Sequence, residues 1–108
     1  MTDSVEFRIS GLGNRLASTR DALAFGTEDG SDVVIRCPAN SGSTLNEKLV
    51  WLWGSLKHKR RVLKSLQADG AVLTCVCDLK AGELVLEPNA AEFLHLTGTT
   101  LIVRLGRS

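Results

Sequence analysis

The strongest constraint on the fold is a row of leucines within residues 44–69. Successive leucines are separated by four, three, four, seven and three residues, a spacing that keeps side chains on one face of an α-helix. A β-strand would require a period of two, which the segment does not show. The sequence therefore predicts one long helix over residues 44–69, whose buried face is formed by Leu45, Leu49, Leu52, Leu56, Leu63 and Leu66.

Both ends of this predicted helix carry end signals. At the N-terminal end, Thr44 is followed three residues later by Glu47, the pattern of a capping box, and Ser43 is an alternative cap. At the C-terminal end, Gly70 stands where a residue with a positive φ angle is favoured. A helix of this length spans about 39 Å. We therefore expect the flanking segments to pack on its leucine face.

The first half of the helix is apolar around its whole circumference. Val50 and Trp51 lie away from the leucine face, and Trp53 lies at its border. One interpretation is that the N-terminal loop folds over these side chains. The other is that they contact a protein partner or a second copy, because tryptophan is enriched where proteins bind one another. Val50, Trp51 and Trp53 are therefore the candidate protein-interaction residues.

The second half of the helix is strongly basic. Residues 57–61 read KHKRR, and Lys57, Arg61 and Lys64 share the face opposite the leucines. Such a row is either a solvated surface or a binding site for the phosphates of a nucleic acid. A net charge of only +1 and the lack of aromatic residues between the basic ones favour the solvated surface. Lys57, Arg61 and Lys64 are the candidate nucleic-acid-binding residues.

The rest of the chain predicts strands and one further clear helix. Pro88 opens this short helix over residues 89–97, and Gly98 closes it. Residues 15–25 suit either a helix or a strand paired through a turn at residues 28–31, and we favour the helix. The strands are recognised by alternation or by β-branched runs, and they cover residues 5–10, 32–37, 71–77, 83–87 and 99–105.

From residue 32 onward the expected order is strand, long helix, strand, strand, short helix, strand. This is the ferredoxin-like βαββαβ arrangement, an α+β fold whose helices cover one face of an antiparallel sheet. The N-terminal strand is an additional one, placed most simply at an edge of the sheet. The other face of the sheet is then open. A chain of 108 residues suits one such domain, over residues 1–108.

Composition suggests a cytoplasmic protein. No apolar run is long enough to span a membrane, and the N-terminal residues lack the basic and apolar regions of a secretory signal. Three cysteines, an odd number without the spacing of a disulfide framework, fit the reducing cytosol. We therefore expect a cytoplasmic location and no membrane partner.

No group of residues forms a recognisable catalytic or metal-binding motif. Cys75 and Cys77 are expected on one face of a strand, about 7 Å apart, which is too far for a relaxed disulfide. Cys37 with either His58 or His95 could complete three metal ligands only through contacts distant in sequence. Buried thiols and structural histidines are the simpler interpretation. We therefore expect no metal, no cofactor and no catalytic residue.

Two segments carry a resemblance to known proteins. They read KRRVLKSLQADGAVLTCVC and ELVLEPNAAEFLHLTGTTLIV, and they contain the patterns L-x-x-L-x-x-x-G and L-x-L-x-P. Over residues 44–105 the chain resembles a family of small bacterial domains of unknown function with an α+β, ferredoxin-like build. Similar small domains are found among immunity-type and phage-associated proteins. The resemblance implies a fold and no functional residue.

Three hypotheses for function follow. The first is a non-catalytic protein-interaction module that binds a partner, or a second copy as a homodimer, through the residues 49–53 or the open sheet face. The second is nucleic-acid binding through the basic face of the long helix. The third is a small ligand-binding protein or an enzyme, which the fold by itself neither supports nor excludes.

Overall fold

The computed structural model describes residues 4–23, 26–42, 44–79 and 84–105. Its regular elements, in chain order, are β1 (Ser4–Ser10), the 3₁₀ turn η1 (Gly13–Arg15), α1 (Leu16–Leu23), β2 (Thr27–Asp29), β3 (Asp32–Arg36), the 3₁₀ turn η2 (Ala39–Ser41), α2 (Leu45–Leu56), the 3₁₀ turn η3 (Lys57–Lys59), α3 (Arg60–Ala68), β4 (Val72–Leu79), α4 (Pro88–Thr97) and β5 (Thr100–Leu105).

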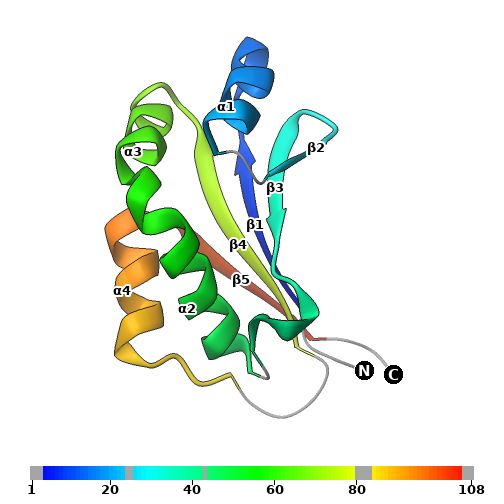
Figure 1. Cartoon of the computed structure of the whole chain (residues 1–108), viewed down its shortest axis with the longest axis vertical. Coiled ribbons are helices and arrows are strands. Elements are labelled where there is room, and N and C mark those ends of the chain that lie inside the picture. Colours follow the sequence, from blue (N-terminus) through cyan, green and yellow to red (C-terminus); the bar gives the residue numbers. More distant parts are fainter. Residues whose placement is uncertain (1–3, 24–25, 43, 80–83, 106–108) are drawn as a thin grey trace.

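The strands form one mixed, five-stranded sheet in the order β2-β3-β1-β4-β5. β1 is antiparallel to both of its neighbours, whereas β4 and β5 are parallel. Helices α2 and α3 follow one another across one face of this sheet, α4 lies beside them, and the other face is open (Figure 1). The chain therefore has the expected α+β class, with one helical layer on one sheet.

The core lies between the sheet and the helices. In β1, Val5, Phe7 and Ile9 are buried on the helical side, and they alternate with polar residues on the open side. All six leucines of the predicted helical stripe are buried against this layer, as expected. Phe93 of α4 contacts both Phe7 and Trp53, with ring centroids 6.0 and 5.7 Å away. These rings attach α4 to β1 and α2.

The predicted helix over residues 44–69 is interrupted. Its beginning is confirmed, because Thr44 and Glu47 form the expected capping box, and its end is confirmed by a positive φ of 99° at Gly70. Between them, α2 and α3 are separate α-helices joined by the 3₁₀ turn η3. The five consecutive basic residues 57–61 include no apolar side chain that could pack on the core. They also place like charges one turn apart, which destabilises a regular helix.

The predicted position of the N-terminal strand is wrong. β1 lies at the centre of the sheet, between β3 and β4, rather than at an edge. The connection from β3 through α2 and α3 to β4 leaves a gap one strand wide, and β1 fills it antiparallel to both neighbours. Alternation in a sequence reveals which face of a strand is buried, but it does not reveal the neighbours.

The strand predicted at residues 83–87 is not formed in its described part, residues 84–87. Leu84 packs against the core while Leu86 is exposed, so the two do not face one way. The backbone N–H of Glu87 donates to Oδ1 of Asn46 at 2.8 Å, and Glu87 then caps α4. In the described residues, β4 therefore leads to the parallel strand β5 through α4, and the six-element ferredoxin-like order is not completed.

The favoured helix of the N-terminal region is confirmed as α1, and the alternative strand is not formed in residues 15–23, while residues 24–25 lie outside the described part of the chain. A turn at residues 28–31 is present, but it joins β2 to β3, with Asp29 paired with Asp32. Gly30 has a φ of 62°, the left-handed conformation that such tight turns require. The short helix is confirmed as α4, with Pro88 in its first turn and Gly98 in the left-handed conformation after its end.

Candidate functional site

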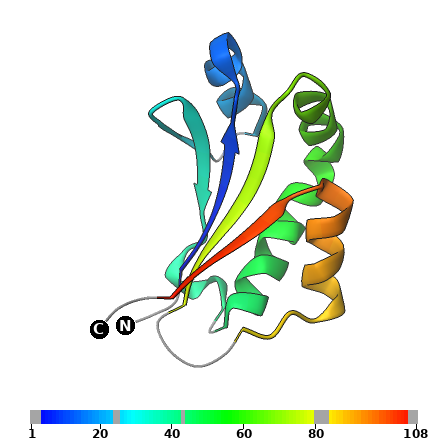
Figure 2. The same ribbon diagram turned by 180° about the vertical axis from the view of Figure 1, so that it is seen from behind.

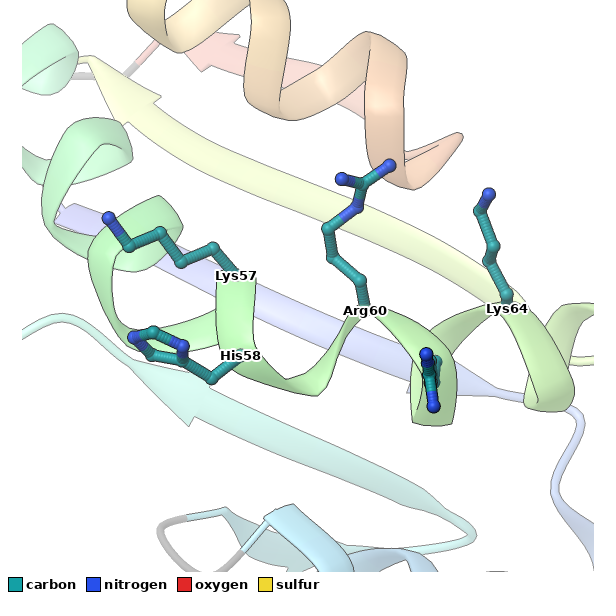
Figure 3. A pocket seen from close by; sticks show the side chains of 5 residues that line it. Lys57, His58, Arg60 and Lys64 are labelled. Atoms are coloured by element: carbon teal, nitrogen blue, oxygen red, sulfur yellow. The ribbon is translucent and has the colours of Figure 1, made fainter.

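A basic depression lies where α2 meets α3. It has a volume of about 330 Å³ and is lined by Lys57, His58, Arg60, Arg61 and Lys64. Lys57, Arg60 and Lys64 extend to the same side of the chain, whereas His58 points away from them (Figure 3). The structure therefore brings the three predicted residues Lys57, Arg61 and Lys64 to one hollow, in which no lining residue is acidic.

Sequence reasoning did not include Arg60 among the candidates, although it lines the same hollow. Residues three and four apart are neighbours on a helix surface. Arg60 follows Lys57 by three residues and precedes Lys64 by four, so this spacing is the signal that could have found it.

These cations also lack acidic partners within the described part of the chain. The ion pairs of that part belong to Arg8, Arg15, Arg20 and Arg36, and none includes a cation of the basic depression. Nε of Arg60 is buried without a hydrogen-bond partner among the described residues. Unpaired cations around a hollow give it a positive potential, which attracts anions.

The predicted protein-interaction residues do not form one exposed patch. Trp53 packs against Phe93, and Val50 and Trp51 are half-buried against the core. Val50 and Trp51 line a shallow depression together with Ser41 of the loop before α2. Val50 and Trp51 are thus partly buried by packing against the core, and their coverage by the N-terminal loop stays an expectation from the sequence.

The open face of the sheet is charged at the end that carries β2 and β3. The Arg8 guanidinium donates to Asp32 at 2.6 Å, to Asp29 at 2.7 Å and to Glu6 at 3.0 Å. The hydrogen bond from Arg8 lowers the pKa of Asp29, and the same carboxylates raise the pKa of Arg8. Because these charges satisfy one another, this end of the face offers little unpaired charge to a partner.

The opposite end of the sheet has two exposed apolar side chains. Ile102 is 40% exposed on the open face and Val103 is 39% exposed on the helical side, both in β5. β5 is the last strand of the sheet, and Figure 2 shows it along the border of the open face. We call the unpaired side of residues 100–105, with these two side chains, the β5 edge. Sequence reasoning missed it, because edge position depends on the order of strands.

Cys37 and Cys75 are not arranged for reaction, whereas the hydrogen bond with Cys75 lowers the pKa of the buried Cys77. Burial raises the pKa of Cys37 to about 12, and a hydrogen bond with Cys77 together with burial raises the pKa of Cys75. Both groups are therefore thiols rather than thiolates near neutral pH, and a thiol is a poor nucleophile and metal ligand. No cluster of three metal-ligating side chains occurs among the residues that the structure describes. His95 is exposed on α4.

A buried lysine was also not foreseen from the sequence. The side chain of Lys48 is 4% exposed, and its Nζ donates to the carbonyl of Gly42 at 2.8 Å. The thiol of Cys37 lies 3.6 Å from the carbonyl oxygen of the same lysine. These contacts fix the loop after β3 against the first turns of α2, and they give Lys48 a structural role.

The chain matches no protein-family model, no curated protein and no solved structure. None of the helices in residues 4–23, 26–42, 44–79 and 84–105 has the length and apolarity needed to cross a bilayer.

Proposed function

We propose that this protein is a non-catalytic interaction module that binds another polypeptide at the β5 edge. The observation that carries the proposal is the exposure of Ile102 and Val103 beside a strand edge that no described strand covers. Such an edge binds an extended segment because main-chain hydrogen bonds provide affinity and the flanking side chains provide specificity. An immunity-type role, which the sequence resemblance implies, is one form of this function.

The β5 edge is a better candidate than the tryptophan-containing turn of α2. Trp53 already has an aromatic partner inside the chain, and Val50 and Trp51 pack against the core. Ile102 and Val103, in contrast, keep more than a third of their surface in water. Covering apolar surface on binding is favourable by about 25 cal/mol per Å². We propose a cytoplasmic location as well, because all three cysteines are free thiols.

Affinity capture from the native host tests the proposal, with wild type, Ile102→Lys and Val72→Lys as baits. Val72 is the matched control, because it is an exposed valine on the same face that lies in β4, outside the edge strand. We expect a partner that wild type and Val72→Lys retain and that Ile102→Lys loses, since an edge lysine disfavours strand pairing. A partner held equally by all three baits would contradict the assignment to β5.

A second candidate function is the binding of single-stranded nucleic acid at the basic depression. The observation that favours it is a hollow lined only by basic side chains, four of them lysine or arginine, without ion pairs among the described residues. Each phosphate that such a cation neutralises releases a condensed counterion. With four contacts, affinity is expected to fall about 50-fold between 50 and 200 mM salt.

A quadruple variant tests this second function: Lys57→Gln, Arg60→Gln, Arg61→Gln and Lys64→Gln together. Its control is Arg15→Gln with Arg20→Gln, two cations already paired with Asp69 and Glu28. Fluorescence anisotropy with a labelled oligonucleotide should show binding by wild type and by the control, and none by the quadruple variant. Wild type that does not bind at 50 mM salt would remove this candidate.

A further inference from the structure

The β5 edge has an unused capacity for hydrogen bonding. β5 contains six residues and pairs on one side only, with β4. In a strand, about half of the backbone N–H and C=O groups point to each side. No strand in the described part of the chain lies beside the outer groups of β5, so no described strand pairs with them.

The sequence of β5 contains little that opposes pairing. Native edge strands are commonly protected by proline, by bulges or by several charged side chains. Residues 100–105 read TLIVRL, with one charge, at Arg104, and neither proline nor glycine. The β-branched and leucine side chains at positions 101–103 instead favour a paired strand.

We infer that the segment bound at this edge is β5 of a second copy of the chain, paired antiparallel about a two-fold axis at Ile102. This inference rests on the proposed function and names its partner. In this register Ile102 lies opposite Ile102, Leu101 opposite Val103, and Thr100 opposite Arg104. Apolar residues thus face apolar residues, and the two arginines face threonines.

Neighbouring registers are less favourable. An axis at Leu101 places Ile102 opposite Thr100 and Val103 opposite Thr99, so apolar side chains face polar ones. An axis at Val103 places Arg104 opposite Ile102, which sets a charge against an apolar side chain. An axis at Arg104 places the two arginines opposite each other, and like charges directly opposite are destabilising.

An axis perpendicular to the sheet at Ile102 also keeps the helices of both copies on one side. Two five-stranded sheets then join into a single sheet through about four to six new hydrogen bonds.

Assembly should stop at the dimer. A two-fold interface uses the same surface on both copies, so it closes when both β5 edges are paired. The other border of the sheet is β2, which has three residues, two of them acidic and held by Arg20 and Arg8. A short, charged strand does not support a second round of pairing.

Cysteine cross-linking tests the register. Under mild oxidation, Ile102→Cys should form a covalent dimer, because residues directly opposite have Cβ atoms about 4.5–5.5 Å apart. Val103→Cys is the matched control, since its opposite residue is Leu101 and the two substituted positions are a diagonal pair. Wild type reports the background from Cys37, Cys75 and Cys77, of which the last two are buried. Equal cross-linking at positions 102 and 103 would overturn the register.

Analytical ultracentrifugation tests the dimer itself. We expect wild type and Val72→Lys to form dimers and Ile102→Lys to be monomeric, with a dissociation constant raised at least about 100-fold, because two lysines would meet at the axis. Monomeric wild type at every concentration, larger polymers, or dimers unaffected by Ile102→Lys would overturn the inference. If wild type is monomeric but captures another protein that Ile102→Lys loses, the proposed function stands and only the second copy is wrong.

Discussion

The two borders of the sheet differ in nearly every property that governs strand pairing. β2 has three residues, and its Glu28 and Asp29 are held by Arg20 and Arg8 at 2.6 and 2.7 Å. β5 has six residues, one charge and two exposed apolar side chains. Both strands have only one neighbour in the sheet. A border strand is therefore not a binding surface merely because it is a border.

The difference lies in how each end satisfies its own polar groups. At the β2 end, carboxylates and guanidinium groups neutralise one another within the chain, and a partner would have to replace those contacts. At the β5 end, backbone groups and apolar side chains have no such internal partner among the described residues. Burying the second kind of surface is favourable, whereas burying the first kind requires desolvation of charges. This contrast leads us to place recognition at β5.

The largest expected effect comes from removing the packing that anchors each end. Phe93→Ala at the β5 end deletes a buried ring that contacts Phe7 and Trp53. Leu23→Ala at the β2 end deletes the buried leucine of α1. We expect losses in the free energy of unfolding of about 3–5 kcal/mol for Phe93→Ala and about 2–3 kcal/mol for Leu23→Ala.

Urea unfolding monitored by tryptophan fluorescence measures both losses. Phe93 links α4 to two other elements, and α4 connects β4 to β5, so its loss should loosen the whole β5 end. An equal or larger loss from Leu23→Ala would mean that the β5 end is not the better anchored one. The two ends of the sheet would then not differ in the way proposed.

A smaller effect is expected from the charges on the open face. Arg8→Met removes the cation shared by Glu6, Asp29 and Asp32, and we expect a loss of roughly 1–2 kcal/mol at pH 7. Arg104→Met is the control. Arg104 lies in β5 on the same open face of the sheet as Arg8, and it makes no ion pair within the described residues. Its loss should be near zero.

The pH dependence gives the sign of this effect. Arg8 lowers the pKa of Asp29 below the ordinary value of 3.8. The stabilisation from Asp29 is therefore complete above that value and disappears as the pH falls through the lowered pKa of the folded state. The difference between wild type and Arg8→Met should shrink when unfolding is measured at pH 2.5 instead of pH 7. A difference that persists unchanged would show that Arg8 stabilises through packing, not charge.

The parts of the fold that were predictable are those that depend on local sequence. The leucine stripe, the Thr44–Glu47 capping box, the Gly70 stop and the Pro88 start each involve residues close in the chain, and the structure contains all of them. The interruption at Lys57–Lys59 was not predictable from periodicity, because a single 3₁₀ turn still leaves Leu63 and Leu66 buried.

What failed depends on contacts between distant segments. The alternation of Val5, Phe7 and Ile9 is the same in a central strand as in an edge strand, so the position of β1 was misjudged. Residues 84–87 have strand-like spacing, but a hydrogen bond to Asn46 and the start of α4 determine their conformation. The β5 edge was missed for the same reason, because residues 100–105 form a border only through the order of strands in the sheet.

The smallest expected effect is at the β2 border itself. Glu28→Gln removes the ion pair with Arg20. The side chains of both residues are more than a third exposed. Solvent screens such a pair, so we expect the free energy of unfolding to change by less than about 0.5 kcal/mol, and the difference to vanish in 1 M salt. Val103→Thr is the counterpart at β5, and its stability should also be nearly unchanged when unfolding is measured at a protein concentration at which wild type is monomeric.

Association should separate these two variants where stability does not. Glu28→Gln keeps β2 short and leaves Asp29 bound to Arg8, so the dissociation constant of the dimer should stay within about twofold of wild type. Val103→Thr exchanges an apolar contact with Leu101 of the second copy for a polar one, and should weaken the dimer by about tenfold. Sedimentation measures both constants. Weakening by Glu28→Gln but not by Val103→Thr would assign self-association to the wrong border.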